Sequence, residues 1–113
     1  MALVISSVEA SKKLTQLSKY AVFFFYDSRK MSTSKFREEF IPLLRLVRRN
    51  PNFKCGQFDK TKVPIPTEKF GFASDKGVII YVNGIYHTYM TDFNLAEFQR
   101  IVSSPESVPM ARV

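Results

Sequence analysis

The stretch Ala21-Val22-Phe23-Phe24-Phe25-Tyr26 is an unbroken apolar run, and the polar segment 27–34 follows it directly. The run has the length of a strand and is far shorter than the ~20 residues that a membrane-spanning helix needs. Continuous rather than alternating apolarity indicates a strand covered on both faces, as in a sheet between layers of helices. The segment therefore predicts a central strand of an α/β fold, with a polar loop at its carboxyl end.

The composition is that of a single globular domain. The chain has 113 residues, 45% hydrophobic and 24% charged, with 17 Lys and Arg against 10 Asp and Glu. One cysteine, Cys55, excludes an internal disulfide framework and a multi-cysteine metal cluster, and one histidine, His87, leaves too little for a conventional zinc site. We expect an intracellular protein of a reducing compartment with no transmembrane segment, no cofactor and no bound metal.

The net charge of +7 is unevenly placed along the chain. Residues 1–50 carry ten basic and four acidic side chains, whereas residues 51–113 carry seven and six. Such asymmetry indicates an anionic partner for one face, either nucleic acid or an acidic protein surface. A solvated helix face that keeps the protein in solution explains the asymmetry equally well.

Strand and helix patterns alternate in the order β-α-β-α-β-α-β-β-α. The strands are predicted at 3–5, 21–26, 53–58, 77–82 and 85–90, and the helices after Ser6, at 33–49, before Gly71 and after Asn94. Pro42 lies inside the longest helix, where we expect a kink. Asn83-Gly84 predicts a tight hairpin between the last two strands. We expect one domain over residues 1–102 and, because residues 103–113 lack apolar periodicity, a flexible C-terminal tail.

This order, with its segment lengths, resembles the thioredoxin fold of thioredoxins and protein disulfide isomerases. The apolar run 21–26 resembles the strand that leads to their active site. Phe58-Asp59-Lys60-Thr61 is similar to their Val-Asp-x-Thr segment, Glu68-Lys69-Phe70-Gly71-Phe72 to Glu-Lys-Tyr-Gly-Val, and the segment 78–84 to Thr-Leu-x-x-Phe-x-Asn-Gly. The resemblance covers residues 3 to 102 and implies a thioredoxin-like α/β fold, with a central mixed sheet flanked by helices.

The chemistry that this resemblance implies has no residues to perform it. The family uses a Cys-x-x-Cys pair at a helix N-terminus, a cis-proline beside the pair and, in thioredoxins, a buried carboxylate behind it. When Phe25-Tyr26 is placed on the family's aromatic pair, the cysteine positions fall on Lys30 and Thr33, the cis-proline on Lys76 and the acid on Phe24. We therefore expect no dithiol oxidoreductase activity and no enzyme, and Lys76 also disfavours a glutathione-dependent transferase.

The remaining reactive side chains are interpreted as structural. Ser32 could act as a nucleophile only with a base, and the chain offers only His87, which is distant in sequence on the last predicted strand. We interpret His87 as a half-exposed strand histidine and Cys55 as a buried, inert thiol. The four glycines are not grouped as a phosphate-binding loop requires, and we expect no small-molecule substrate.

A second resemblance spans residues 34–53. Ser34-x-Phe36-Arg37, entering a helix that ends in Arg49-Asn50-Pro51-x-Phe53, is similar to the thioredoxin-like domain of several mitochondrial ribosomal proteins and of a small subunit of respiratory complex I. This likeness implies a small structural subunit of a large assembly, in the mitochondrion rather than the cytoplasm. The small thioredoxin-fold protein of the spliceosome is another instance of that use.

Two functions follow from these patterns. The first is a redox-inactive structural or interaction subunit of a mitochondrial complex, such as the ribosome or a respiratory or ATP-synthase complex, that docks through a basic helix onto protein subunits, rRNA or an acidic protein surface. The candidate partner-binding residues are Arg29, Lys30, Lys35, Arg45, Arg48 and Arg49. The second is a non-catalytic chaperone or client-binding module like the redox-silent domains of disulfide isomerases. We expect neither a secretory signal nor a retention tail, which favours the first.

Overall fold

The computed structural model describes residues 3–4, 8–62, 74–91 and 93–109. Its elements are β1 (Leu3–Val4), α1 (Val8–Leu17), β2 (Tyr20–Tyr26), α2 (Thr33–Arg48), β3 (Phe53–Asp59), β4 (Lys76–Val82), β5 (Ile85–Met90), α3 (Leu95–Ser103) and the short 3₁₀ turn η2 (Pro105–Ser107). Apart from η2, which the sequence does not predict, the described elements occur in the predicted order. The helix predicted before Gly71 and the cap predicted at Ser6 lie outside the described residues.

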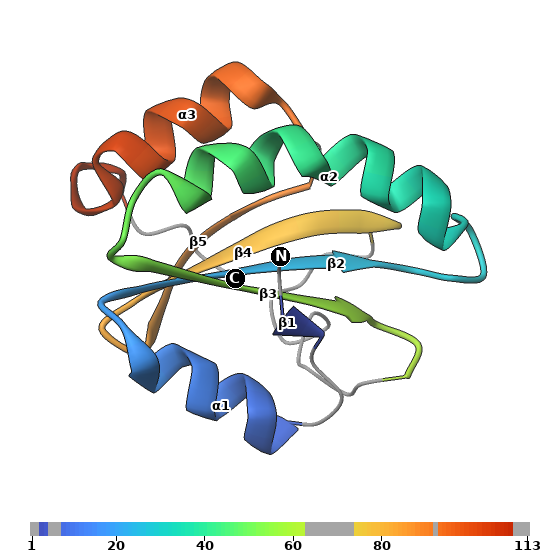
Figure 1. Cartoon of the computed structure of the whole chain (residues 1–113), viewed down its shortest axis with the longest axis horizontal. Helices are drawn as coiled ribbons and strands as arrows, with labels where there is room; N and C mark the ends of the chain where they lie inside the picture. The colour runs from blue at the N-terminus through green and yellow to red at the C-terminus, as the bar shows by residue number, and fades with distance from the viewer. Residues whose placement is uncertain (1–2, 5–7, 63–73, 92, 110–113) are drawn as a thin grey trace.

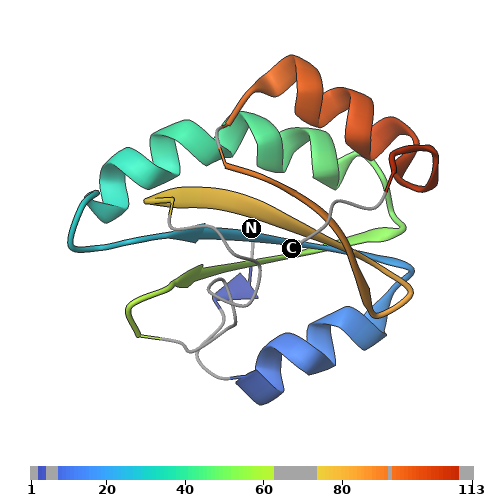
Figure 2. The ribbon, with the colours of Figure 1, turned by 180° about the vertical axis from the view of Figure 1, so that it is seen from behind.

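The strands form one mixed sheet in the order β1-β3-β2-β4-β5. β3 pairs in parallel with β1 and β2, whereas β4 is antiparallel to β2 and β5. Helix α1 covers one face of the sheet, and α2 and α3 cover the other (Figure 1, Figure 2). Within the described ranges, no helix is both long enough and apolar enough to cross a membrane.

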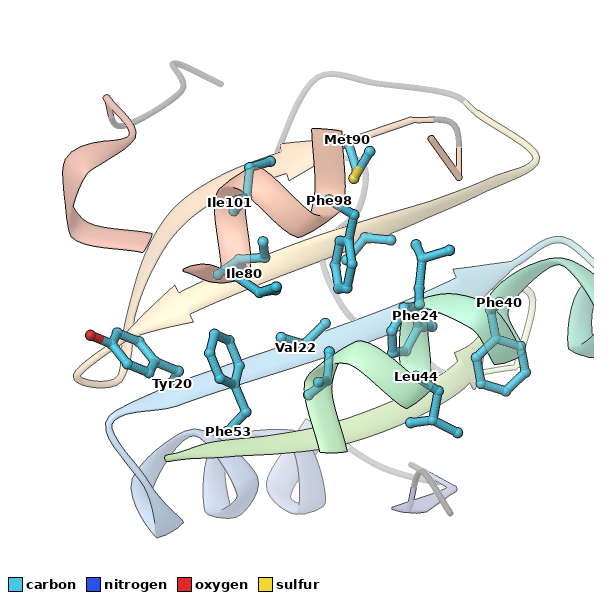
Figure 3. Packing of buried hydrophobic residues seen from close by; sticks show 14 of the residues in the cluster. Tyr20, Val22, Phe24, Phe40, Leu44, Phe53, Ile80, Met90, Phe98 and Ile101 are labelled. Atoms are coloured by element: carbon cyan, nitrogen blue, oxygen red, sulfur yellow. The ribbon is translucent and has the colours of Figure 1, made fainter. Parts of the chain in front are cut away.

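Strand β2 lies at the centre of the sheet and is covered on both faces, as its continuous apolar sequence predicts. Its first six residues are buried, and only Tyr26 is partly exposed. Phe24 faces α2 and α3, with its ring 5.2 Å from that of Phe40 and 6.0 Å from that of Phe98 (Figure 3). Phe25 faces the other way and stacks on Phe58 at 5.8 Å. An apolar ring therefore occupies the place that the resemblance assigns to a buried acid.

The turn and the helix starts form where the sequence predicts them. Asn83 and Gly84 have φ angles of 52° and 80°, the two positive values that a type I′ hairpin turn requires. The Ser32 side chain accepts a hydrogen bond from the Lys35 amide at 3.1 Å, which caps α2. Helix α2 continues through Pro42, which is exposed, to Arg48. The kink expected at Pro42 stays a prediction.

Residues of the C-terminal segment contact the rest of the domain. Pro105 and Val108 are buried, and the Tyr20 hydroxyl donates to Glu106 Oε1 at 2.7 Å. His87 Nε2 donates to the Val108 carbonyl oxygen at 2.6 Å. Single buried side chains and hydrogen bonds to residues distant in sequence leave no periodic pattern, so the sequence does not predict these contacts, and the flexible tail over residues 103–113 stays a prediction. Residues 110–113 lie outside the described residues.

Candidate functional site

The first candidate site is the loop at the carboxyl end of β2, where open α/β sheets commonly bind ligands. Two backbone amides, those of Lys30 and Met31, donate to the Asp27 carbonyl oxygen at 3.0 and 2.9 Å and close the loop into a turn. The Asp27 amide donates to the Asp75 carbonyl oxygen at 2.7 Å, which ties the loop to the segment before β4. The loop is thus held on both sides by backbone hydrogen bonds.

Asp27 and Arg29 form the strongest charge pair of this loop. The Asp27 side chain is almost fully buried and accepts from Arg29 Nε at 3.0 Å, Nη2 at 2.8 Å and the backbone amide at 2.9 Å. These hydrogen bonds from Arg29 lower the pKa of Asp27 from 3.8 to about 2. Arg29 was predicted as a partner-binding residue, but its charge is compensated within the loop, which weakens its use for a partner.

Asp59 anchors the same loop to β3. Its Oδ1 accepts from the Thr61 hydroxyl at 2.8 Å, the Thr61 amide at 3.0 Å and the Ser28 amide at 3.3 Å. Burial alone would raise the pKa of Asp59, but the hydrogen bonds from Ser28 and Thr61 outweigh it and the pKa is lowered. The Asp-x-Thr pattern in the sequence is the signal for this arrangement, which is structural.

The two positions that the resemblance assigns to cysteines carry no nucleophile with a base. Lys30 is exposed on the turn. Thr33 begins α2, and its hydroxyl lies 3.1 Å from that of Tyr26, whose ring stacks on Phe36 at 4.4 Å. His87 is half-buried on β5 and is engaged with the Val108 carbonyl, as the interpretation of a structural histidine requires.

An ion pair occupies the position that the resemblance assigns to the cis-proline. Lys76 begins β4, and its ammonium group pairs with the Glu39 carboxylate of α2. The same ammonium lies 5.1 Å from the centre of the Phe93 ring, a cation–π contact. With Asn94, these residues line an open hollow of about 420 Å³. Sequence reasoning found Lys76 but missed Glu39 and Phe93, because 37 residues separate the ion pair along the chain.

Cys55 is far from this loop and has little thiolate character. The register pairs Cys55 with Val22, four residues before Tyr26 on β2. Burial raises the pKa of Cys55 to about 12, although Arg48 and Lys54 oppose that shift. The predicted inert thiol is therefore consistent with its surroundings, although the side chain is only partly buried.

The six predicted basic residues form two separate groups rather than one patch. Arg29, Lys30 and Lys35 lie at the N-terminal end of α2, and Arg45, Arg48 and Arg49 lie at the other end; all six are exposed. The 16 residues of α2 span about 24 Å at 1.5 Å per residue. A single small contact cannot engage both groups.

The charges of the C-terminal group, Arg45, Arg48 and Arg49, are not paired with acidic side chains of the described residues. None of these three arginines forms an ion pair with another residue in the described part of the chain, whereas Arg29 pairs with Asp27. Spacings of three and four residues place the three guanidinium groups on one face of the helix end. Lys30 and Lys35 of the N-terminal group likewise form no ion pair with a described residue, so the C-terminal group differs in that all three of its members are unpaired and all are arginines.

The mixed sheet with helices on both faces is a thioredoxin-like fold, as the sequence predicts. Plasmodium falciparum thioredoxin superposes with a TM-score of 0.73 at 13% identity, over 90% of this chain and 97% of that one. Mitochondrial thioredoxin 3 from Saccharomyces cerevisiae, in its oxidized form, gives 0.74 at 11% identity, over 90% and 93%. A designed protein gives 0.77 at 16% identity, over 92% and 96%.

At 11–16% sequence identity, these similarities establish the fold alone. No protein-family model and no curated protein matches the sequence. The chain has one cysteine and no Cys-x-x-Cys pair, so the dithiol chemistry that the sequence resemblance implies lacks its reacting atoms. Within the described ranges, no group of three or more His, Cys, Asp or Glu side chains is placed to hold a metal ion.

Proposed function

We propose that this chain is a redox-inactive, non-enzymatic interaction subunit of a large assembly and that it docks through the C-terminal end of α2. The observation that carries the proposal is the group of three exposed arginines, Arg45, Arg48 and Arg49, which no described acidic side chain neutralises. A guanidinium group binds a carboxylate or a phosphate through two parallel hydrogen bonds. Such a group on a scaffold without reactive thiols favours binding over catalysis.

The competing explanation is structural. Cations in the last turn of a helix interact favourably with its dipole, by about 0.3–1 kcal/mol each at an exposed site. That explanation predicts a loss of stability, but no loss of partner, when the arginines are replaced. Docking predicts the reverse, so stability and assembly must be measured on the same variants.

The test compares two triple variants with the same change of charge. Arg45→Glu, Arg48→Glu and Arg49→Glu alter the proposed docking end, and Lys30→Glu, Lys35→Glu and Arg37→Glu alter the opposite end. Tagged full-length chains are sedimented from gentle lysates at physiological salt, and the thermal unfolding of each purified variant is recorded. We expect only the first variant to leave the heavy fractions, while both remain folded. Retention of the first variant in the assembly, or its unfolding, would overturn the docking role.

A mitochondrial assembly is the specific setting that we propose. It is supported by the similarity of residues 34–53 to thioredoxin-like mitochondrial subunits. In the structure these residues are α2 and the turn that leads into β3, so the resemblance and the three arginines share one element. Fractionation of organelles with an antibody to the chain tests the setting independently of docking. Recovery outside mitochondria would remove the setting and leave the docking proposal in place.

The alternative function is a non-catalytic chaperone or client-binding module. Four exposed large apolar side chains favour it: Leu17, Ile41, Ile85 and Leu95. They come from four different elements, however, and scattered apolar residues are normal on protein surfaces. Suppressed aggregation of an unfolded client, such as reduced insulin, at stoichiometric amounts of this chain would favour the alternative.

A further inference from the structure

A groove opens at one end of the sheet, next to the proposed docking arginines. The C-terminal ends of α1 and α2 lie at this end on opposite faces of the sheet, with the start of β3 between them (Figure 1, Figure 2). The groove has a volume of about 500 Å³, and side chains of both helices and of β3 line it. It is distant from the loop after β2, where the redox centre of the resemblance would lie.

Part of the groove wall is apolar. Leu14 from α1 and Leu44 and Val47 from α2 are buried and line it. Leu17, the last residue of α1, also lines it but is 61% exposed. A large apolar side chain in water beside an apolar groove loses contact with water when a partner covers it. The groove can therefore accept an apolar side chain from outside.

The strand at the base of the groove is only partly covered by its neighbour. Among the described residues, β1 pairs with Gly56 and Gln57 of β3 and has no partner at Phe53–Cys55. Cys55 is half-buried and lines the groove.

The charges at the groove are all positive. Arg48 and Lys54 line it, and no acidic residue of the described chain does so. Neither of these two cations forms an ion pair with another described residue. Arg45 and Arg49 continue the positive charge along the end of α2. The complementary partner is therefore negative around an apolar centre.

A protein segment fits these features better than RNA does. Single-stranded RNA binds through exposed aromatic rings that stack on its bases and through cations that follow its phosphates. Phe53 is the one aromatic residue among the described lining residues, and it is 6% exposed and stacked on Tyr20 at 4.8 Å. Leucine and valine side chains have no hydrogen-bond donor or charge that could bind a phosphate, whereas they can pack against an apolar side chain.

We infer that this groove is the docking site of an acidic protein segment. The segment inserts an apolar side chain between Leu17 and Leu44, and its carboxylates meet Arg48 and Lys54. The inference rests on the proposed function and narrows its partner from an anionic surface in general to a protein with apolar and acidic side chains together.

The first arm of the test applies the sedimentation assay described above to point variants of the full-length chain. Leu17→Asp places a negative charge on the exposed rim, and Arg48→Glu reverses a lining charge. Leu95→Asp is the matched control, because Leu95 is 45% exposed on α3 and does not line the groove. We expect the assembly-bound fraction to fall at least tenfold for the first two variants and to stay at the wild-type level for the control, with unchanged circular dichroism for all three.

The second arm identifies what lies in the groove. A benzophenone amino acid is introduced at position 17 or, as the control, at position 95, and the gradient-purified assembly is irradiated with and without ribonuclease. We expect a cross-link from position 17 to a peptide with acidic and apolar residues, formed equally after ribonuclease treatment. A cross-link to RNA, or release of the wild-type chain by ribonuclease, would overturn the inference in favour of nucleic acid.

The outcomes separate this inference from the proposed function. If the wild-type chain sediments with an assembly and Leu17→Asp remains in it, the groove is not the docking site, while the subunit role stands. If the wild-type chain sediments alone, the proposed function fails and the groove inference fails with it.

Discussion

Asp27 is only 2% exposed, yet its ion pair with Arg29 keeps the Asp27 carboxyl group charged. The hydrogen bonds from Arg29 lower the pKa of Asp27 to about 2 in the folded state, against an ordinary value of 3.8. Between these two values the unfolded chain binds more protons than the folded one, so folding stability falls as the pH falls. The stabilisation is fully present above about pH 3.8 and is lost as the pH falls through about 2.

This pH dependence gives the first prediction. Asp27→Asn should lower the urea midpoint of unfolding at pH 7, and its difference from the wild type should shrink between pH 4 and pH 2. The measurement is urea unfolding of both chains across this range, with the exposed Asp75→Asn as a control. A difference of the same size at pH 7 and pH 2 would show that the Asp27 charge has no such role.

Cys55 carries the second prediction at this scale. Burial raises its pKa from 9.0 to about 12, which leaves far less thiolate at neutral pH than an unperturbed cysteine has. The difference corresponds to roughly a thousandfold smaller thiolate population. Alkylation by iodoacetamide at pH 7.5 should therefore be at least about 100-fold slower in the folded protein than in urea. Equal rates, followed by mass spectrometry, would refute the inert thiol.

Among the strands, the contact between β4 and β2 depends on a missing side chain at Gly77. A Cβ atom there would lie 2.6 Å from Phe25 Cζ and 3.0 Å from the Met90 carbonyl oxygen. Because Phe25 stacks on Phe58 in the core, its ring has little room to move. Gly77→Ala should destabilise the fold by about 1 to 3 kcal/mol through overpacking. Urea unfolding measures the cost, and a variant as stable as the wild type would place the Phe25 ring elsewhere.

The C-terminal turn η2 gives a prediction that decides between a packed segment and a flexible tail. Val108 is buried and lies beside Pro109, which is exposed. Val108→Ala removes two buried carbon groups and should cost about 1 to 2 kcal/mol, whereas Pro109→Ala should cost almost nothing. Thermal unfolding of the two variants provides the comparison. If Val108→Ala unfolds with the wild type, residues 103–113 are the tail that the sequence predicts.

The elements that the sequence predicts correctly are those with a strong local signal. The apolar run of β2, the cap Asn94 and the turn Asn83-Gly84 each depend on neighbouring residues, so a short window contains the whole pattern. The pairing of Tyr20 with Glu106 joins residues 86 positions apart, and that of His87 with Val108 joins residues 21 positions apart. No local pattern marks such contacts.

In the candidate sites too, the sequence predicts groupings of nearby residues but not contacts between distant ones. Helical spacing was enough to group Arg45, Arg48 and Arg49, because these positions lie within one turn. The compensation of Arg29 by Asp27 and the ion pair of Lys76 with Glu39 required the folded chain. Helical spacing with Leu14 places Leu17 on the apolar stripe of α1, yet Leu17 is the last residue of the helix and is 61% exposed.

For the molecule as a whole, the fold resembles that of a redox enzyme, but the side chains at the corresponding positions cannot perform dithiol chemistry. The scaffold is thioredoxin-like, but an ion pair and a charged turn occupy the positions that the sequence resemblance assigns to the reactive groups. Three further cations without a described ion-pair partner, Arg45, Arg48 and Arg49, lie at the other end of α2, beside a partly apolar groove. Three arginines without a described ion-pair partner thus lie where the fold has no catalytic position, which is why we propose a binding function.

The most direct test of this assignment is the native mass of the endogenous, untagged chain. Gentle lysates at physiological salt are separated by size, and the chain is detected by antibody or mass spectrometry across the fractions. The account predicts that most of the chain migrates in a particle many times larger than its own 13.0 kDa. A chain that migrates alone, at the position of a 13.0 kDa monomer, would contradict it.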